Sequence, residues 1–132
     1  MIQHYPDSKP FYETLSNFLD IPAEQIIVTS GIDEAIRNIL ILNCTGSRPF
    51  FTNAPAYAMY KVYGEILNVE CISFQPLPEN FVNPDELISK IPENVGVVFI
   101  ANPSQPVENC YDIPQLETVA NYCNSILRSF KL

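Results

Sequence analysis

The sequence predicts an α/β fold: a mainly parallel sheet with helices on both faces. Short apolar runs alternate along the chain with longer segments whose apolar residues recur at helical spacing. The run at 96–101 is apolar at odd and even positions alike, which is typical of a central parallel strand that is buried on both sides. Strands that alternate with helices favour parallel pairing through right-handed crossovers.

In the first third of the chain, two helices are expected to flank one strand. A helix is expected from 7–10 onward, because phenylalanine and leucine then recur at i, i+4, i+7 and i+8. Three β-favouring or apolar residues within 25–29 predict a short buried strand. The clearest helix covers 32–44. It is apolar around most of its circumference, so we expect it to lie between two layers.

The remaining elements alternate in the same way. Strands are expected at 49–52, 70–74 and 96–101, and a further strand is expected to begin at 126–127. Helices are expected at 56–67, at 113–122 and, more briefly, from Pro84 until Pro92 ends the helix.

Composition excludes several classes of function. The chain has 132 residues, which suits one domain or part of a larger one. Seven Lys and Arg stand against fifteen Asp and Glu, and the net charge of −8 excludes a broad basic face for nucleic acid. No apolar run approaches the roughly 18 residues that a membrane span needs. The start of the chain has neither the basic residues nor the apolar run of a signal peptide. We therefore expect a cytoplasmic protein with no membrane partner.

The four cysteines and the single histidine do not form a metal-binding motif. No Cys-x-x-Cys is present, and a zinc site would need ligands scattered along the whole chain. We expect no metal, and we expect free, mostly buried thiols in a reducing compartment.

Three loops follow predicted strands and are where ligand chemistry is expected, because ligands of parallel sheets bind at the carboxyl ends of the strands. They are 29–31, 52–55 and 101–105. The first leads into a helix whose leading amides can bind an anion, although an ordinary helix start would look the same. The second precedes Tyr57, which could cover a flat ligand or could be a core aromatic. The third carries Asn and Gln amides that could bond a ligand oxygen or only form a polar turn.

Taken together, these segments resemble the fold type I pyridoxal-phosphate-dependent aminotransferases of classes I and II, and most closely the histidinol-phosphate aminotransferase branch. His4-Tyr5-Pro6-Asp7 is similar to that branch's Arg-Tyr-Pro-Asp, and 21–36 is similar to its phosphate-binding segment. Pro55-Ala56-Tyr57-Ala58-Met59-Tyr60 resembles Pro-Thr-Tyr-x-Met-Tyr. The segment 102–108 stands where the family has Asn-Pro-Asn-Asn-Pro-Thr-Gly. The resemblance extends from Tyr5 to about Leu127.

The resemblance implies pyridoxal 5′-phosphate (PLP) as cofactor and assigns it a set of binding residues. The amides of Ile32 and Asp33 would hold its phosphate, and Gly31 would ease the approach of that phosphate to the backbone. Tyr57 would stack on the pyridine ring, and Gln105 would replace the asparagine that bonds the ring oxygen. Tyr5 would reach the phosphate held by the other subunit of a homodimer.

The chain also departs from the family pattern. Gln105 is longer than the family's asparagine, and Val107-Glu108 replaces Thr-Gly. The family's aspartate that faces the pyridine nitrogen and its Schiff-base lysine both lie beyond the Asn-Pro loop. Ser129-Phe130-Lys131 does not stand where that lysine is expected. We therefore expect 1–132 to be part of the large PLP-binding domain, without the N-terminal arm, the rest of the large domain and the small domain. No catalytic residue is assigned.

Two functional readings stay open beside an aminotransferase fragment that is inactive alone and forms a homodimer or aggregates. One is a non-catalytic acidic α/β binding or interaction module that keeps a residual phosphate site. The other is an unrelated doubly wound nucleotide-binding domain of flavodoxin type, which the absence of a glycine-rich first turn disfavours.

Overall fold

The computed structural model describes residues 7–44, 47–77, 83–105 and 109–129, with side chains up to 126. The chain divides into two compact units, Met1–Gly31 and Ile32–Leu132.

The first unit contains helix α1, Lys9–Leu19, and the short 3-10 helix η1, Ala23–Gln25. Asp20 ends α1 in the left-handed conformation, and its N–H donates to the Ser16 carbonyl oxygen. The Tyr12 hydroxyl accepts a hydrogen bond of 3.4 Å from the Val28 N–H. This contact holds the segment after η1 against α1.

The strand predicted within 25–29 is wrong. After η1 the chain is extended but forms no strand, and the Ile27 side chain is 82% exposed. A strand exists only when a neighbouring strand takes up its backbone hydrogen bonds. Among the described residues of the first unit there is no such neighbour, so the local preference of these residues for a strand is not realised.

The second unit is built on a three-stranded sheet in the order β2-β1-β3, where β1 is Phe50–Asn53, β2 is Cys71–Phe74 and β3 is Val97–Phe99. Both pairings are parallel, with Phe51 opposite Ile72 on one side and Val98 on the other. The parallel α/β prediction is confirmed. The central strand of the described sheet is β1, not the segment 96–101 that the sequence favoured, because β1 alone has neighbours on both sides.

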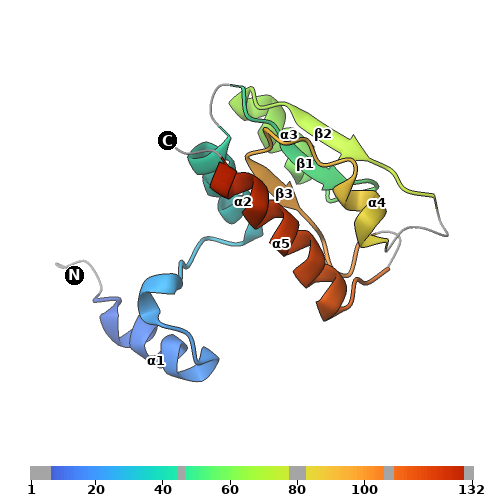
Figure 1. The fold of residues 1–132 in the computed structure, drawn as a ribbon. Helices are drawn as coiled ribbons and strands as arrows, with labels where there is room; N and C mark the ends of the chain where they lie inside the picture. Colours follow the sequence, from blue (N-terminus) through green and yellow to red (C-terminus); the bar gives the residue numbers. More distant parts are fainter. Residues whose placement is uncertain (1–6, 45–46, 78–82, 106–108, 130–132) are drawn as a thin grey trace. The chain divides into compact units, whose positions relative to one another are not determined.

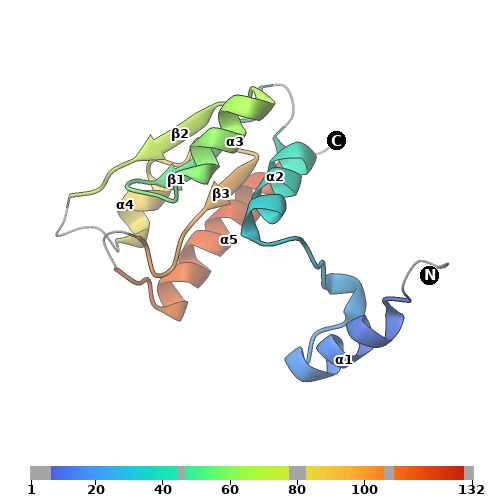
Figure 2. The same cartoon turned by 180° about the vertical axis from the view of Figure 1, so that it is seen from behind.

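Helices cover both faces of this sheet (Figures 1 and 2). Helices α2 (Ile32–Asn43) and α3 (Met59–Leu67) lie on one face, and α4 (Pro84–Ile88) and α5 (Ile113–Ser129) lie on the other. Phe50 and Phe51 are adjacent in β1 and fully buried, and they point to opposite faces, as alternation in a strand requires. Each anchors its own core cluster.

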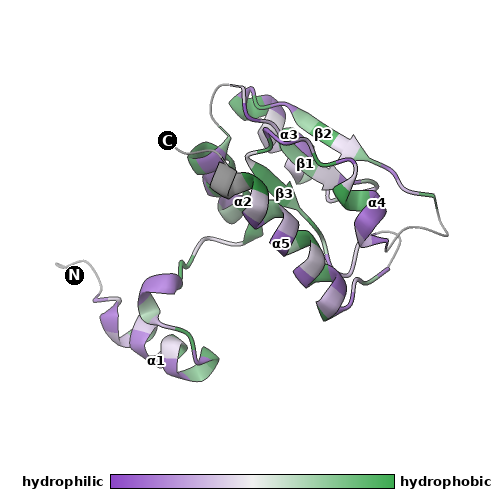
Figure 3. Cartoon of the chain, in the orientation of Figure 1, coloured by the Kyte–Doolittle hydropathy of each residue, from purple (hydrophilic) through white to green (hydrophobic). Residues whose placement is uncertain are grey.

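The two clusters hold the layers together. On the α2 and α3 face, Phe50 packs with the buried residues Ile36, Leu40 and Cys44. On the α4 and α5 face, Phe51 packs with the buried residues Leu87, Ile91, Val95, Tyr111, Val119 and Ile126. Strand β3, which contributes to both clusters, is coloured as apolar along its length in Figure 3.

The strand predicted to begin at 126–127 is also wrong, because α5 continues through this point to Ser129. Ile126 is 8% exposed and packs into the core with Val119. Leu116, Val119, Cys123 and Ile126 recur at helical spacing and face that core. No glycine or proline interrupts the chain between 115 and 129, so the helix does not stop at 122.

The cysteines are unpaired, but they are not mostly buried. Cys44 is buried, Cys71 and Cys123 are half-buried, and Cys110 is exposed. In the described parts of the chain, no helix is long and apolar enough to cross a membrane, and no group of three metal-binding side chains gathers.

Candidate functional site

Residues that lie in, or shortly after, the three loops predicted to carry chemistry line one cavity of the second unit. The cavity has a volume of about 330 Å³ and is lined by Ile32, Tyr57, Tyr60, Ala101, Pro103 and Gln105. Of the residues predicted to bind a cofactor, Ile32, Tyr57 and Gln105 are thus brought together from segments far apart in the sequence. Its volume lies within the roughly 300–1,000 Å³ that small-molecule sites have.

The start of α2 contributes a helix N-terminus to this cavity. Ile32 and Asp33 are its first two residues, and the N–H groups of a first helical turn have no acceptor inside the helix. Gly31, directly before them in the chain, has a φ of 89°, which L side chains rarely adopt. A Cβ added at Gly31 would meet nothing within 4 Å. This arrangement suits an anion.

Asp33 also acts through its side chain, which the sequence did not indicate. The Tyr57 hydroxyl donates a hydrogen bond of 3.0 Å to Asp33 Oδ1. This bond joins the start of α2 to the loop before α3. The hydrogen bond to Asp33 raises the pKa of the Tyr57 hydroxyl, with smaller contributions in the same direction from burial and from Tyr63 and Tyr60.

Tyr57 is the outer end of a row of aromatic rings. It meets Tyr60 edge to face, with ring centroids 5.8 Å apart, and Tyr60 stacks on Phe99 of β3 at 4.6 Å and 10°. Phe99 in turn meets Phe50 at 5.8 Å. Burial raises the pKa of the Tyr60 hydroxyl. Tyr60 was not among the predicted site residues, although its spacing of three from Tyr57 placed both on one side of a helix start.

The loop after β3 is fixed by its own polar groups. Asn102 donates through Nδ2 to the Tyr111 carbonyl oxygen at 3.0 Å and accepts at Oδ1 from the Tyr111 N–H at 2.8 Å. Its amide therefore serves the loop, contrary to the prediction that it could bind a ligand. Ser104 is buried, and its hydroxyl donates to the Pro55 carbonyl oxygen at 3.5 Å. Gln105 then lines the cavity, whereas 106–108, with Val107-Glu108, lie outside the described residues.

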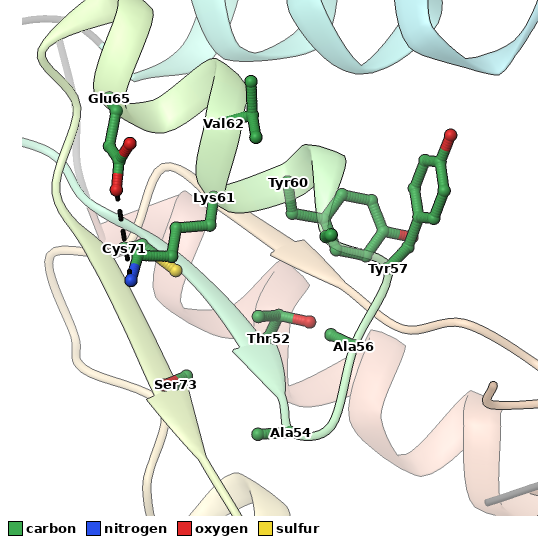
Figure 4. Close-up of a pocket in the computed structure, with 11 residues that line it drawn as sticks. Thr52, Ala54, Ala56, Tyr57, Tyr60, Lys61, Val62, Glu65, Cys71 and Ser73 are labelled. Carbon is green, nitrogen blue, oxygen red and sulfur yellow. Dashed lines mark ion pairs between the residues drawn. The ribbon is translucent and has the colours of Figure 1, made fainter. Parts of the chain in front are cut away.

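A second cavity, of about 380 Å³, shares Tyr57 and Tyr60 with the first and extends over the end of β1 and along β2 from Cys71 to Ser73 (Figure 4). Lys61 lines it and forms an exposed ion pair of 3.9 Å with Glu65. Burial raises the pKa of the Cys71 thiol, and the Lys61 charge partly opposes that effect. The two tyrosines thus border two cavities, and any ligand experiment has to distinguish them.

Tyr5 and the lysines are the other residues that bear on a PLP site. Tyr5 and Lys131 lie outside the described residues. Lys9 belongs to the first unit, and Lys90 stands 5.6 Å from the centre of the Phe74 ring. None of the lysines that the structure describes lines the cavity formed by Ile32, Tyr57 and Gln105.

Comparison with known proteins decides the family. The family model for aminotransferase class I and II matches residues 3–127. The chain belongs to the class I and II aminotransferase family. The predicted resemblance and the predicted fold type I architecture are both confirmed.

Individual aminotransferases are similar to this chain in sequence or in fold. Histidinol-phosphate aminotransferase of Francisella philomiragia is 27% identical over 124 residues, which are 90% of this chain and 34% of that protein. Tyrosine aminotransferase from Leishmania infantum superposes with a TM-score of 0.78 at 18% identity, over 95% of this chain and 38% of its own. The chain spans about a third of the length of the curated relatives it matches.

One solved structure of the same fold contains the implied cofactor. Cystalysin from Treponema denticola, which contains pyridoxal 5′-phosphate, superposes with a TM-score of 0.78 at 13% identity over 95% of this chain and 34% of its own. In the present chain, the residues at the first cavity fit such a group. An aromatic ring is available for a flat heterocycle, an amide side chain for a ring substituent, and the start of α2 at Ile32 for a phosphate.

Proposed function

We propose that the second unit forms the phosphate-binding and ring-stacking part of a PLP site in an aminotransferase. One observation carries the proposal: Ile32 at the start of α2, Tyr57 before α3 and Gln105 after β3 line a single cavity at the carboxyl side of a parallel sheet. The family match supports the same conclusion from the sequence.

Each residue has a distinct role in this proposal. The amides of Ile32 and Asp33 bind the phosphate at the N-terminus of α2, where the helix dipole favours negative charge. Gly31 leaves the backbone open to that group. Tyr57 covers the ring, and the Gln105 amide bonds the ring oxygen. When bound, PLP supplies an electron sink for amino-group chemistry.

The substrates follow from the relatives rather than from the cavity. We propose that the whole enzyme moves an amino group between an amino acid, or an amino-alcohol phosphate such as histidinol phosphate, and a 2-oxo acid. The similarity to histidinol-phosphate aminotransferase supports this class of substrate. We further propose a homodimer, in which Tyr5 of one copy reaches the phosphate in the other.

The 132 residues alone are proposed to be inactive. An aminotransferase needs a lysine at the cofactor, and no described lysine lines this cavity. Chain supplied with PLP, an amino donor and a 2-oxo acid should therefore show no transamination above buffer. Turnover, together with stoichiometric cofactor trapped by borohydride on one of Lys9, Lys61, Lys90 or Lys131, would contradict this.

Binding is best tested with pyridoxine 5′-phosphate, which has an alcohol in place of the aldehyde and forms no covalent bond with lysine. Titration should move the NMR amide signals of Ile32, Asp33 and the Gln105 side chain first. Without the covalent lysine we expect a dissociation constant in about the millimolar range. Inorganic phosphate should move Ile32 and Asp33 but not Gln105, because it has no ring.

Two variants complete the test. Tyr57→Leu should weaken pyridoxine 5′-phosphate about three- to tenfold, because the ring contact is lost. Phe18→Leu is the matched control: this phenylalanine is 83% exposed in the first unit and does not line the cavity. If both variants bind like the original chain, or if shifts occur only elsewhere, the proposed site is refuted.

A further inference from the structure

Asp33 contributes two groups to the proposed site, its backbone N–H and its carboxylate, and these have opposite electrostatic effects on a bound anion. Its backbone N–H belongs to the helix start proposed to bind the phosphate. Its carboxylate lies 3.0 Å from the Tyr57 hydroxyl oxygen, at the other wall of the cavity. Repulsion from a carboxylate so close to an anion site weakens anion binding, unless a second effect of the same side chain on ligand affinity offsets it.

The contribution that the geometry indicates is control of the Tyr57 ring. Tyr57 is 41% exposed, so packing alone leaves its ring partly free. One edge rests on Tyr60, which is itself held flat against Phe99. Its hydroxyl end donates a hydrogen bond to Asp33, and in Figure 4 the ring extends outward from the loop before α3 toward α2. The ring is therefore fixed at both ends.

We propose that Asp33 is a positioning residue, whose carboxylate holds the Tyr57 ring in the orientation that a flat ligand needs for stacking. The proposal rests on the proposed function for the identity of that ligand. Its physical basis is general: a preorganised binding surface loses less conformational freedom when the ligand arrives. Positioning is distinct from binding, because the carboxylate itself would touch neither the ring nor the phosphate of the ligand.

Repulsion of the anion and positioning of Tyr57 predict opposite changes in ligand affinity when the Asp33 carboxylate is removed, which makes the proposal testable. If the carboxylate only repels the anion, removing it strengthens binding of pyridoxine 5′-phosphate and of inorganic phosphate alike. If it positions Tyr57, removing the acceptor weakens pyridoxine 5′-phosphate and not inorganic phosphate. Asp33→Ala removes both charge and acceptor, whereas Asp33→Asn removes the charge and keeps an amide oxygen that can accept from Tyr57.

We expect the full 132-residue chain with Asp33→Ala to bind pyridoxine 5′-phosphate about 3- to 10-fold more weakly than the chain with Asp33→Asn, the loss typical of one hydrogen bond. Inorganic phosphate should bind the two variants equally. In a Tyr57→Phe background the difference between Ala and Asn at 33 should disappear, because no hydroxyl remains to be held. Glu34→Ala is the matched control, since Glu34 is the next acid of the same helical turn and pairs with Arg37.

A readout without ligand separates this inference from the proposed function. In the unliganded chain the hydrogen bond that the Tyr57 hydroxyl donates to Asp33 raises the pKa of that hydroxyl. Asp33→Ala should lower that pKa, measured by NMR of the Tyr57 ring, and Asp33→Asn should lower it less. If no chain binds pyridoxine 5′-phosphate but this order of pKa values holds, the proposed function fails while positioning of Tyr57 stands. If Ala and Asn at 33 give equal ligand affinity, or an unchanged Tyr57 pKa, the positioning role is overturned.

Discussion

Replacing Gly96 by alanine should destabilise the second unit through a single steric conflict. An ideal Cβ at this position would stand 2.4 Å from the Asn43 carbonyl oxygen and 2.8 Å from Cys44 Sγ. Ordinary carbon–oxygen contacts are about 3.3–3.6 Å, so the end of α2 would have to move by about 1 Å. Gly96 cannot yield instead, because its N–H donates to the Pro49 carbonyl oxygen at 2.7 Å, next to β1.

The expected loss in the free energy of unfolding depends on how easily the end of α2 can move. Overpacking a well-packed core usually costs about 1–3 kcal/mol, and here the nearest atom is helix backbone rather than a flexible side chain. We therefore expect Gly96→Ala to lower the free energy of unfolding by about 2–3 kcal/mol, near the upper part of that range. With slopes of about 1–3 kcal/mol/M in urea, the midpoint should fall by about 0.7–3 M.

Urea unfolding followed by circular dichroism is the appropriate assay, because the chain has no tryptophan. A double-mutant cycle isolates the cause. Cys44→Ala alone should destabilise, since Cys44 is buried in the core beside Leu40. In the Gly96→Ala background the same change should be neutral or stabilising, because it removes one of the two clashing atoms. A Gly96→Ala chain that unfolds within about 0.5 kcal/mol of the original, the range of ordinary surface substitutions, would refute the packing of α2 against β3.

The remaining predictions concern the glycine before α2, the thiols and the sheet edges. Gly31→Ala should lower the free energy of unfolding by about 1–2 kcal/mol through its left-handed backbone alone, and Gly31→Asn by less, both measured in urea. Burial raises the pKa of the Cys44 thiol, so its reactive thiolate is scarcer at a given pH. Iodoacetamide, with labelling read by mass spectrometry, should therefore modify exposed Cys110 first and Cys44 only on unfolding. Early labelling of Cys44 would contradict its burial. In the described sheet β2 and β3 each pair on one side only, so light scattering should show dimers or larger species, and a monodisperse monomer would count against this.

Sequence patterns predicted the layers of the second unit because each layer follows from local regularity. The helix from Ile32 and the strands around Phe51 and Val98 each carry their own periodicity, and alternation of the elements then favours a parallel sheet. The strand expected at 126–127 failed because a short apolar run fits a helix or a strand equally well. Continuation of the core-facing spacing from Val119 decides for the helix, and that spacing was present in the sequence.

The candidate site was predictable as a set of loops but not as a set of contacts. The family resemblance singled out Ile32, Tyr57 and Gln105, and the structure places all three at one cavity, although among the described residues no strand precedes the first of them. The sequence could not show that the Asn102 amide is used by Tyr111, or that Asp33 accepts from Tyr57. Both bonds join different segments of chain, and their formation depends on distances that no local pattern encodes.

The central claim is that a pyridoxine-type ring lies between Tyr57 and the loop that carries Gln105. The most direct measurement is of intermolecular NOEs from the ring protons of pyridoxine 5′-phosphate to the full chain. We expect NOEs to Tyr57, Ala101 and the Gln105 side chain, which border the first cavity. NOEs instead to Ala54, Val62 and Ser73, which border only the second cavity, would show that the ring binds on the other side of the tyrosines and would refute the proposed site.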